Sequence, residues 1–301
     1  MKYGLALAGG GTRGAAHAGV LLALEEEKML PDFIAGTSAG SIAAGCFASG
    51  MRAEALCDFV HHMAVHGKEY LDPDIKELVR LIPQTIRGDK TGLSGLLKGE
   101  RLKHYFCKIT RNQRLEDIKM DLLIPAVDLI SGDTICFTNR IGRAETEGKE
   151  KRSKPAHMVK NQRIRWVAEG RLCDIMMASS SVPGVFRPVH LNHCCLVDGG
   201  VVDNLPVDLM KAVGARKVVA VDIGSDYEMP EDDTIFEILS HSFSLMSSSL
   251  KDCRTRGEDV LLKPELTKKA GLLTFDKMEE CMEEAYHYTK KNIGLVQRAV
   301  L

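Results

Sequence analysis

The segment Gly36-Thr37-Ser38-Ala39-Gly40 has the spacing of a tight turn that presents a nucleophilic serine. It lies between DFIA, typical of a buried strand, and SIAAGCFA, typical of a helix rich in small residues. In such a turn the serine hydroxyl projects into the site, and a glycine two residues to either side lets the backbone pass closely. The following helix directs its first amides at the reacting centre and favours negative charge there. The pattern predicts Ser38 as the nucleophile of acyl-transfer chemistry, supported by Gly36 and Gly40.

A serine nucleophile needs a base, and Asp198 is the candidate. The strand-like segment CCLV precedes it, and Gly199 and Gly200 open the backbone after it. A carboxylate with an ordinary pKa near 3.9 is a poor base for a hydroxyl, so partial desolvation must raise that pKa. A conventional third member, a histidine after the acid, could only be His241 or His287. Neither is flanked by turn glycines, and we interpret both as surface or helix residues.

The glycine-rich segment GGGTRG runs from Gly9 to Gly14, after a strand-like apolar run over residues 3–8. Its spacing also fits a dinucleotide-binding loop, but that site requires an acidic residue at the end of the second strand to hold a ribose. Here the second strand ends in the serine turn. Free glycine amides suit an oxyanion hole better, and each such donor lowers a barrier by about 3–4 kcal/mol. Arg13 either steadies this loop and adds positive potential, or pairs with a surface carboxylate.

These segments lie in an alternation of predicted strands and helices, which favours an α/β layered fold with a largely parallel sheet. An ordinary α/β-hydrolase places its nucleophile after several strands, whereas Ser38 follows about one strand–helix unit, so the topology differs. DLLIPAVDL and DTICFTN predict two strands around a Ser131-Gly132 turn, and DVLLKPEL a late strand. Further helices are expected over 52–66, 74–82, 100–110, 232–253 and 276–298.

The composition predicts an ordinary globular protein, with 45% hydrophobic and 27% charged residues. A net charge of −1 gives no global attraction to nucleic acid or to acidic membranes. No internal repeat or linker divides the chain, so we expect one domain over residues 1–301. The nine cysteines include no C-x-x-C pair, which suggests reduced thiols in a cytoplasmic protein rather than a disulfide framework. No stretch approaches the ~20 apolar residues that cross a bilayer.

Residues 139–165 interrupt the pattern, with nine lysines and arginines against three glutamates. We expect an exposed or disordered surface insertion, with attraction to a membrane surface as the alternative. Nucleic-acid binding is not expected, because only Trp166 supplies an aromatic residue at its border. The histidines at 61, 62 and 66 lack a carboxylate or a second ligand pair, so the sequence predicts no metal site.

Taken together, GGGTRG (9–14), GTSAG (36–40) and DGG (198–200) resemble the patatin-like phospholipase family. ASSSVPGVFRPV (178–189) and DNLPV (203–207) also resemble its flanking segments, and the likeness covers most of residues 3–225. The resemblance implies a three-layer α/β/α fold and hydrolysis without metal or other cofactor. It also implies a Ser38–Asp198 dyad that lacks histidine, and an oxyanion hole at the amides of Gly10, Gly11 and Thr12. The basic segment departs from the family, in which a short turn is expected.

The resemblance implies a lipid or other acyl-ester substrate, hydrolysed as by a phospholipase A or a lysophospholipase, with contact at a membrane surface. Two alternatives stay open. An acyltransferase would use the same acyl-enzyme, although the related transferase turn carries histidine where this chain has Thr37. A non-catalytic adaptor could use the same fold, although it would need neither the serine, the acid nor the glycine loop.

Overall fold

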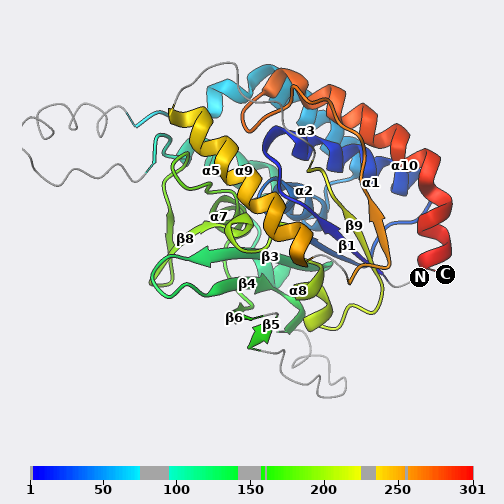
Figure 1. Cartoon of the computed structure of the whole chain (residues 1–301), viewed down its shortest axis with the longest axis horizontal. Coiled ribbons are helices and arrows are strands. Elements are labelled where there is room, and N and C mark those ends of the chain that lie inside the picture. The colour runs from blue at the N-terminus through cyan, green and yellow to red at the C-terminus, as the bar shows by residue number, and fades with distance from the viewer. Residues whose placement is uncertain are drawn as a thin grey trace, which may run out of the picture.

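The computed structural model describes residues 3–74, 95–141, 157–159, 161–224, 235–254 and 257–300. Its centre is a mixed ten-stranded sheet with the order β10-β9-β1-β2-β3-β4-β6-β5, to which β8 adds on β3 and β7 on β8 (Figure 1). The predicted helix over 74–82 lies almost wholly outside the described residues. The strands are β1 (Gly4–Leu7), β2 (Phe33–Gly36), β3 (Asp121–Asp128), β4 (Thr134–Thr138), β5 (Met158–Val159), β6 (Gln162–Val167), β7 (Val189–Leu191), β8 (Cys194–Asp198), β9 (Val218–Val221) and β10 (Val260–Leu262).

The strands β10, β9, β1, β2 and β3 run parallel to one another. Every residue of β1, β2 and β9 is buried, which explains why these strands read as continuous apolar runs rather than as alternating patterns. β3 and β4 form the predicted antiparallel pair around the Ser131-Gly132 turn. The N-terminal apolar run is therefore the buried first strand that the sequence indicates.

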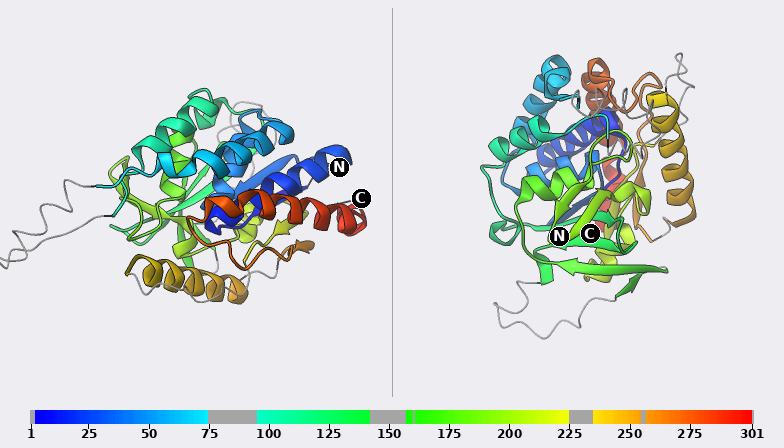
Figure 2. Two further views of the ribbon diagram at one scale, coloured as in Figure 1. Left: turned by 90° about the horizontal axis from the view of Figure 1, so that it is seen from above. Right: turned by 90° about the vertical axis from the view of Figure 1, so that its left-hand side faces the viewer.

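Helices flank the sheet, which confirms the predicted α/β class with its α/β/α layers. The α-helices are α1 (Ala16–Glu26), α2 (Ala39–Ala48), α3 (Ala53–His66), α5 (Glu100–Ile109), α7 (Leu172–Ser179), α8 (Val207–Ala212), α9 (Ile235–Arg254) and α10 (Met278–Val300). The short 3-10 turns are η1 (Gly11–Ala15), η2 (Gly67–Tyr70), η3 (Leu115–Asp117), η4 (Gly199–Val201) and η5 (Phe275–Lys277). α1, α3 and α10 pack together, and α9 stands apart from that layer (Figure 2).

The basic segment 139–165 is only partly an insertion. Its start, Asn139, is buried, and its end belongs to β6, which pairs with β4 inside the sheet. β6 is buried at alternate residues, so Arg163 and Arg165 point outward and pair with Asp133 and Asp128. The expectation of an exposed insertion over this whole range is therefore wrong at both ends, because alternating arginines hid a half-buried strand. Residues 142–156 and 160 lie outside the described part.

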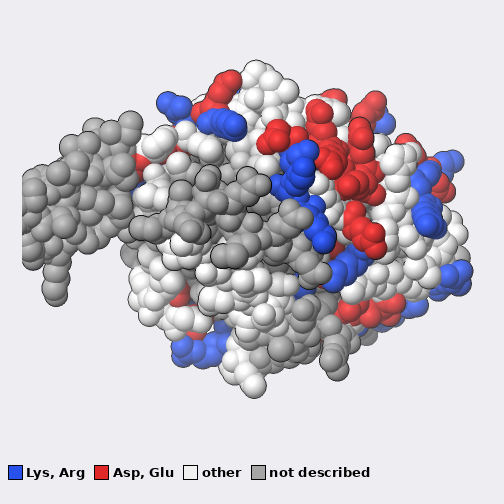
Figure 3. All heavy atoms as spheres, turned by 45° about the horizontal axis from the view of Figure 1, so that its top comes forward, with Lys and Arg blue, Asp and Glu red and all other residues white. Residues whose placement is uncertain are grey.

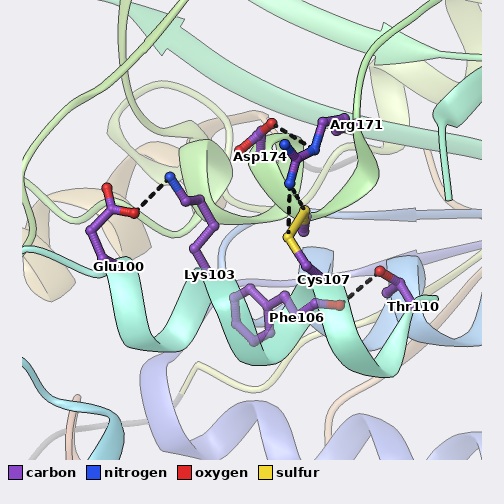
Figure 4. The surroundings of a disulfide bond; sticks show 8 residues. Glu100, Lys103, Phe106, Cys107, Thr110, Arg171 and Asp174 are labelled. Atoms are coloured by element: carbon purple, nitrogen blue, oxygen red, sulfur yellow. Dashed lines mark hydrogen bonds and ion pairs between the residues drawn. A yellow bond between two sulfur atoms is a disulfide. The ribbon is translucent and has the colours of Figure 1, made fainter. Parts of the chain in front are cut away.

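One pair of cysteines differs from the expectation of reduced thiols. Cys107 of α5 and Cys173 of α7 form a disulfide (Figure 4). The Arg171 guanidinium donates hydrogen bonds to both sulfurs, at 3.3 and 3.6 Å, and forms an ion pair with Asp174 at 3.4 Å. Sequence spacing gives no sign of this pair because 66 residues separate its members. On the face of the molecule that Figure 3 shows, acidic and basic side chains of the described residues lie close to one another.

Candidate active site

Ser38 occupies the turn between β2 and α2, and its backbone is in the left-handed region with φ 53°. This conformation is rare for a residue with a side chain and persists only where the surroundings impose it. A Cβ at Gly36 would lie 2.1 Å from the carbonyl oxygen of Gly40, and one at Gly40 would lie 2.3 Å from that of Leu7. Both glycines are thus required by close backbone packing, as the sequence pattern predicts.

The Ser38 backbone is held by serines from the end of α7. The Ser38 N–H donates to Ser179 Oγ at 3.1 Å, and Ser179 Oγ donates to the Pro125 carbonyl at 2.7 Å. The Ser38 carbonyl accepts hydrogen bonds from Ser41 Oγ at 2.6 Å and from Ser180 Oγ at 3.2 Å. The segment ASSSVPGVF therefore has a physical role, positioning the nucleophile, that its sequence alone did not reveal.

Asp198 is the last residue of β8 and is fully buried. Burial raises the pKa of its carboxyl from 3.8 to about 7, and hydrogen bonding from the Ser38 hydroxyl and the Gly200 N–H partly offsets this effect. The Gly200 N–H lies 2.7 Å from Oδ1. The other oxygen, Oδ2, is buried and has no hydrogen-bond partner among the described residues. The Ser38 hydroxyl is thus near enough to lower the pKa of Asp198, but its position does not meet the geometry of a hydrogen bond. Such a carboxyl has the proton affinity that a base for serine needs.

Neither candidate histidine joins this arrangement. His241 lies on α9 and His287 on α10, where its ring packs edge-on against Tyr286. Neither is among the described residues that line the cavities at Ser38. The interpretation of both as surface or helix residues fits their positions.

The glycine loop enters η1 beside Ser38. The Gly9 N–H donates to the backbone carbonyl and to the side-chain Oδ1 of Asn204, both at 3.1 Å. The Thr12 N–H donates hydrogen bonds to the carbonyl oxygens of Gly271 and Leu272, at 3.3 and 3.2 Å. The amides of Gly10 and Gly11 make no hydrogen bond to any described residue. Of the three predicted oxyanion donors, Gly10 and Gly11 are therefore the available ones in this conformation.

The glycine loop is anchored by a segment near the C-terminus, residues 267–272, which we call the strap. Arg13 is fully buried, and its Nη2 donates to the Thr267 carbonyl at 2.9 Å. Thr12 Oγ1 donates to the Gly271 carbonyl at 2.7 Å. Gly14 packs so closely that an added Cβ would lie 2.4 Å from that of Ala39. From this buried position, Arg13 thus ties the glycine loop to the strap.

His17 supports the residue before the glycine loop, and its only sequence signal is a polar residue inside an apolar helix. It is fully buried in α1, and its Nε2 lies 2.8 Å from the carbonyl oxygen of Ala8, directly before Gly9. Burial lowers the pKa of His17 to about 4, while its hydrogen bond to Ala8 and the charge of Asp222 oppose that shift. The ring is therefore neutral near pH 7, with its proton on Nε2 donated to the backbone.

Two cavities meet at Ser38. The first, called here the apolar cavity, holds about 890 Å³ of atom-free space including its open mouth and is lined mainly by hydrophobic side chains such as Leu56, Phe59, Val60, Met63 and Phe106. The second, the polar cavity, holds about 480 Å³ on the same measure. Its lining includes the Gly9–Gly11 loop, Asp198, Asn204 and one face of α9. The predicted nucleophile, base and oxyanion loop are thus brought together at one boundary.

The described residues hold no group of three or more histidine, cysteine or carboxylate side chains that could bind a metal ion. His61 and His66 pair instead with Glu279 and Glu69, at 2.6 and 2.9 Å. Across the same residues, no helix combines the length and the apolar character that crossing a bilayer demands.

Among solved structures, the chain is similar to VipD from Legionella pneumophila and to human GIVD cytosolic phospholipase A2. For VipD the TM-score is 0.48 at 16% identity, covering 99% of this chain and 67% of that one. For the human enzyme, solved with methyl gamma-linolenyl fluorophosphonate and terbium chloride, the TM-score is 0.49 at 14% identity. The match covers 98% of this chain and 59% of the human one.

Among curated proteins, the chain is 26% identical to an uncharacterized NTE family protein of Mycobacterium tuberculosis (strain CDC 1551 / Oshkosh), over 94% of this chain and 45% of that protein. It is 31% identical to lysophospholipase NTE1 of Yarrowia lipolytica (strain CLIB 122 / E 150), over 74% of this chain and 13% of that protein. It therefore spans less than half the length of these relatives. The sequence model described as patatin-like phospholipase matches residues 5–211. The chain belongs to the patatin-like phospholipase family.

Proposed function

We propose that this chain is a serine acyl-hydrolase that cleaves lipid esters through Ser38 and Asp198. One observation carries the proposal. A serine in a left-handed turn, a buried carboxyl with a pKa of about 7, and a loop with two unbonded amides border the same cavity. An acyl transfer needs these three parts, namely a nucleophile, a base and donors for an oxyanion.

In the first step, the Asp198 carboxylate takes the hydroxyl proton of Ser38 while Oγ attacks the ester carbonyl. The amides of Gly10 and Gly11 stabilise the negative charge that develops on the carbonyl oxygen. When the tetrahedral intermediate collapses, the bond to the alcohol oxygen breaks and Asp198 returns its proton to that oxygen. The alcohol leaves and the acyl group stays on Ser38.

In the second step, a water molecule gives a proton to Asp198 and attacks the acyl carbonyl. The same amides hold the second oxyanion. Collapse breaks the bond to Ser38 Oγ, which recovers its proton from Asp198, and the fatty acid is released. Asp198 serves as base and then acid in both steps, so a pKa near the working pH suits its task.

The substrate class follows from the apolar cavity, which reaches Ser38 and offers hydrophobic side chains to an acyl chain. Among the described cavities that border Ser38, one is apolar and the other polar, which favours an ester with a single long chain. The name lysophospholipase carried by the Yarrowia relative agrees with such a substrate. Transfer to an acceptor other than water would use the same groups and remains the second candidate, which added alcohols would reveal as new ester products.

Contact with a lipid surface is assigned to the outer face of α9. Ile238, Leu239, Leu245 and Met246 are each at least half exposed, and residues 238–250 contain no Lys, Arg, Asp or Glu. A helix whose exposed apolar face lacks charge favours the lipid–water boundary. Replacing Leu245 and Met246 by serine should reduce co-sedimentation with phosphatidylcholine vesicles. Unchanged sedimentation would refute this assignment.

Hydrolysis of 1-decanoylglycerol and of lysophosphatidylcholine tests the proposed function. Wild-type protein should release fatty acid, and Ser38→Ala should lower the rate by about 10³-fold or more, because the nucleophile is lost. Ser49→Ala, at the end of the same helix α2, is the matched control and should keep full activity. A Ser38→Ala protein that hydrolyses either ester at the wild-type rate would refute the proposal.

A further inference from the structure

One wall of the polar cavity has no part in the proposed chemical steps. Helix α9 contributes Ser244, Ser247, Ser248 and Lys251 to the lining, which they share with the glycine loop and Asp198. These residues follow one another at intervals of three, one and three positions, which places them on one face of a helix. They lie beyond residues 5–211, where the family match ends.

Ser247 is the side chain that points to a ligand. It is 5% exposed, and its hydroxyl is buried without a hydrogen-bond partner among the described residues. A buried hydroxyl in that state lowers stability unless something else bonds it. A Cβ built on Gly200 would lie 3.0 Å from Asp198 Oδ1 and 3.3 Å from Ser247 Oγ. The unbonded hydroxyl therefore lies within about 6 Å of the proposed base, the upper bound that these two distances set.

The charges at this wall select the kind of ligand. Lys251 Nζ lies 2.6 Å from Asp222 Oδ1, and both side chains are buried, so the two charges offset each other. An added Cβ on Gly224 would lie 2.6 Å from the same Nζ, so glycine leaves room for the pair. An anion bound here would face the Asp198 carboxylate without an excess of positive charge, so a lysophospholipid, whose alcohol part carries a phosphate, should be a poorer substrate than an uncharged glycerol ester. Uncharged hydroxyl groups suit the wall better.

The position of Ser38 between the two cavities determines which cavity receives the acyl part of an ester and which receives the alcohol part. If the acyl chain occupies the apolar cavity, the alcohol lies on the opposite side of the serine, in the polar cavity. We propose that Ser247, with Ser244 and Ser248, binds the free hydroxyl groups of the alcohol part, so that the enzyme prefers esters of glycerol-like polyols. This site rests on the proposed hydrolase function and adds its alcohol specificity.

A matched pair of esters tests the site. 1-Decanoylglycerol and propyl decanoate share the acyl chain and the three-carbon alcohol, and differ in two hydroxyl groups. Wild type should prefer the glycerol ester in kcat/KM. Ser247→Ala should reduce that preference by about three- to ten-fold, through the glycerol ester alone, since one hydrogen bond is lost. Ser249→Ala, exposed on the same helix, should leave the ratio unchanged.

Thermal unfolding separates binding from a structural role. Removing an unbonded buried hydroxyl should leave the melting temperature unchanged or raise it. An unchanged ester ratio, or an equal loss on both esters with a lowered melting temperature, would overturn the hydroxyl-binding site. A wild-type protein that cleaves neither ester would instead overturn the hydrolase proposal, and the alcohol site would fall with it.

Discussion

The apolar and polar cavities share Ser38 and Gly11 but are built from opposite kinds of side chain. The apolar cavity is enclosed mainly by α3, α2 and η1, with further residues from α5 and η5, and most of its hydrophobic side chains belong to the protein core or pack against it. The polar cavity is enclosed by loop ends and by the serine face of α9, and its lining includes serine hydroxyls, the Asn204 amide and the buried Asp198 carboxyl. Core packing alone can form the first cavity, whereas the second requires each polar group to be placed individually.

The free-energy cost of burying a charged group falls on the polar cavity. Burial holds the Asp198 carboxyl at a pKa of about 7, so its charged form is disfavoured in the folded protein. The apolar cavity carries no comparable penalty. Catalysis and alcohol recognition should therefore depend on pH and on single polar side chains of the polar cavity. Acyl recognition should depend on the volume of the side chains that line the apolar cavity.

Of the two effects that separate the cavities, the larger should come from pH, acting through the polar cavity. Asp198 must be ionised to accept the Ser38 proton, so kcat/KM should rise with pH and level off above about 8. With a pKa of about 7, the value at pH 5 should be about 100-fold below the plateau. A pH profile of 1-decanoylglycerol hydrolysis between pH 5 and 9 measures this. The acyl-chain preference should not change with pH.

The control for that profile is the His241→Ala, His287→Ala double variant, which should titrate as wild type does. His17 should not contribute, because burial holds its pKa at about 4, below the measured range. A rate that does not change between pH 5 and 9, or a limb that disappears in the double variant, would contradict the assignment of Asp198 as base.

A smaller effect should follow from filling the apolar cavity. Val60→Phe enlarges a buried lining residue of α3 and should lower kcat/KM for decanoyl and longer esters by about ten-fold, since room for one or two methylenes is lost. Butanoyl esters should be little affected. Val65→Phe, on the exposed side of the same helix, is the matched control. Equal losses for short and long chains would show that the cavity does not hold the acyl group.

Sequence reasoning recovered the parts of the site that are local in the chain. Ser38, Asp198 and the glycine loop each belong to a short motif whose glycines are required by close backbone contacts, so their spacing carries the signal. The largely parallel sheet near these motifs followed from the same alternation of apolar runs and helices, whereas the order of its strands did not. Their roles as nucleophile, base and oxyanion donors stay predictions until activity is measured.

The remaining parts depend on contacts that sequence spacing does not encode. The strap meets the glycine loop across 259 residues, at the bond from Thr12 to Gly271. Ser179 and Ser247 are ordinary serines in helices, and only the fold shows that one supports Ser38 and the other faces Asp198. Likewise, the Cys107–Cys173 pair appears only once α5 and α7 are packed together.

The most direct test of the central claim is covalent labelling with a fluorophosphonate probe, located by mass spectrometry. The wild-type protein should carry the adduct on Ser38. Asp198→Asn should slow labelling by about 10³-fold or more, because the base is removed while the fold is kept. The His241→Ala, His287→Ala double variant should label at the wild-type rate. An adduct on another residue, or Asp198→Asn labelling as fast as wild type, would contradict the Ser38–Asp198 mechanism.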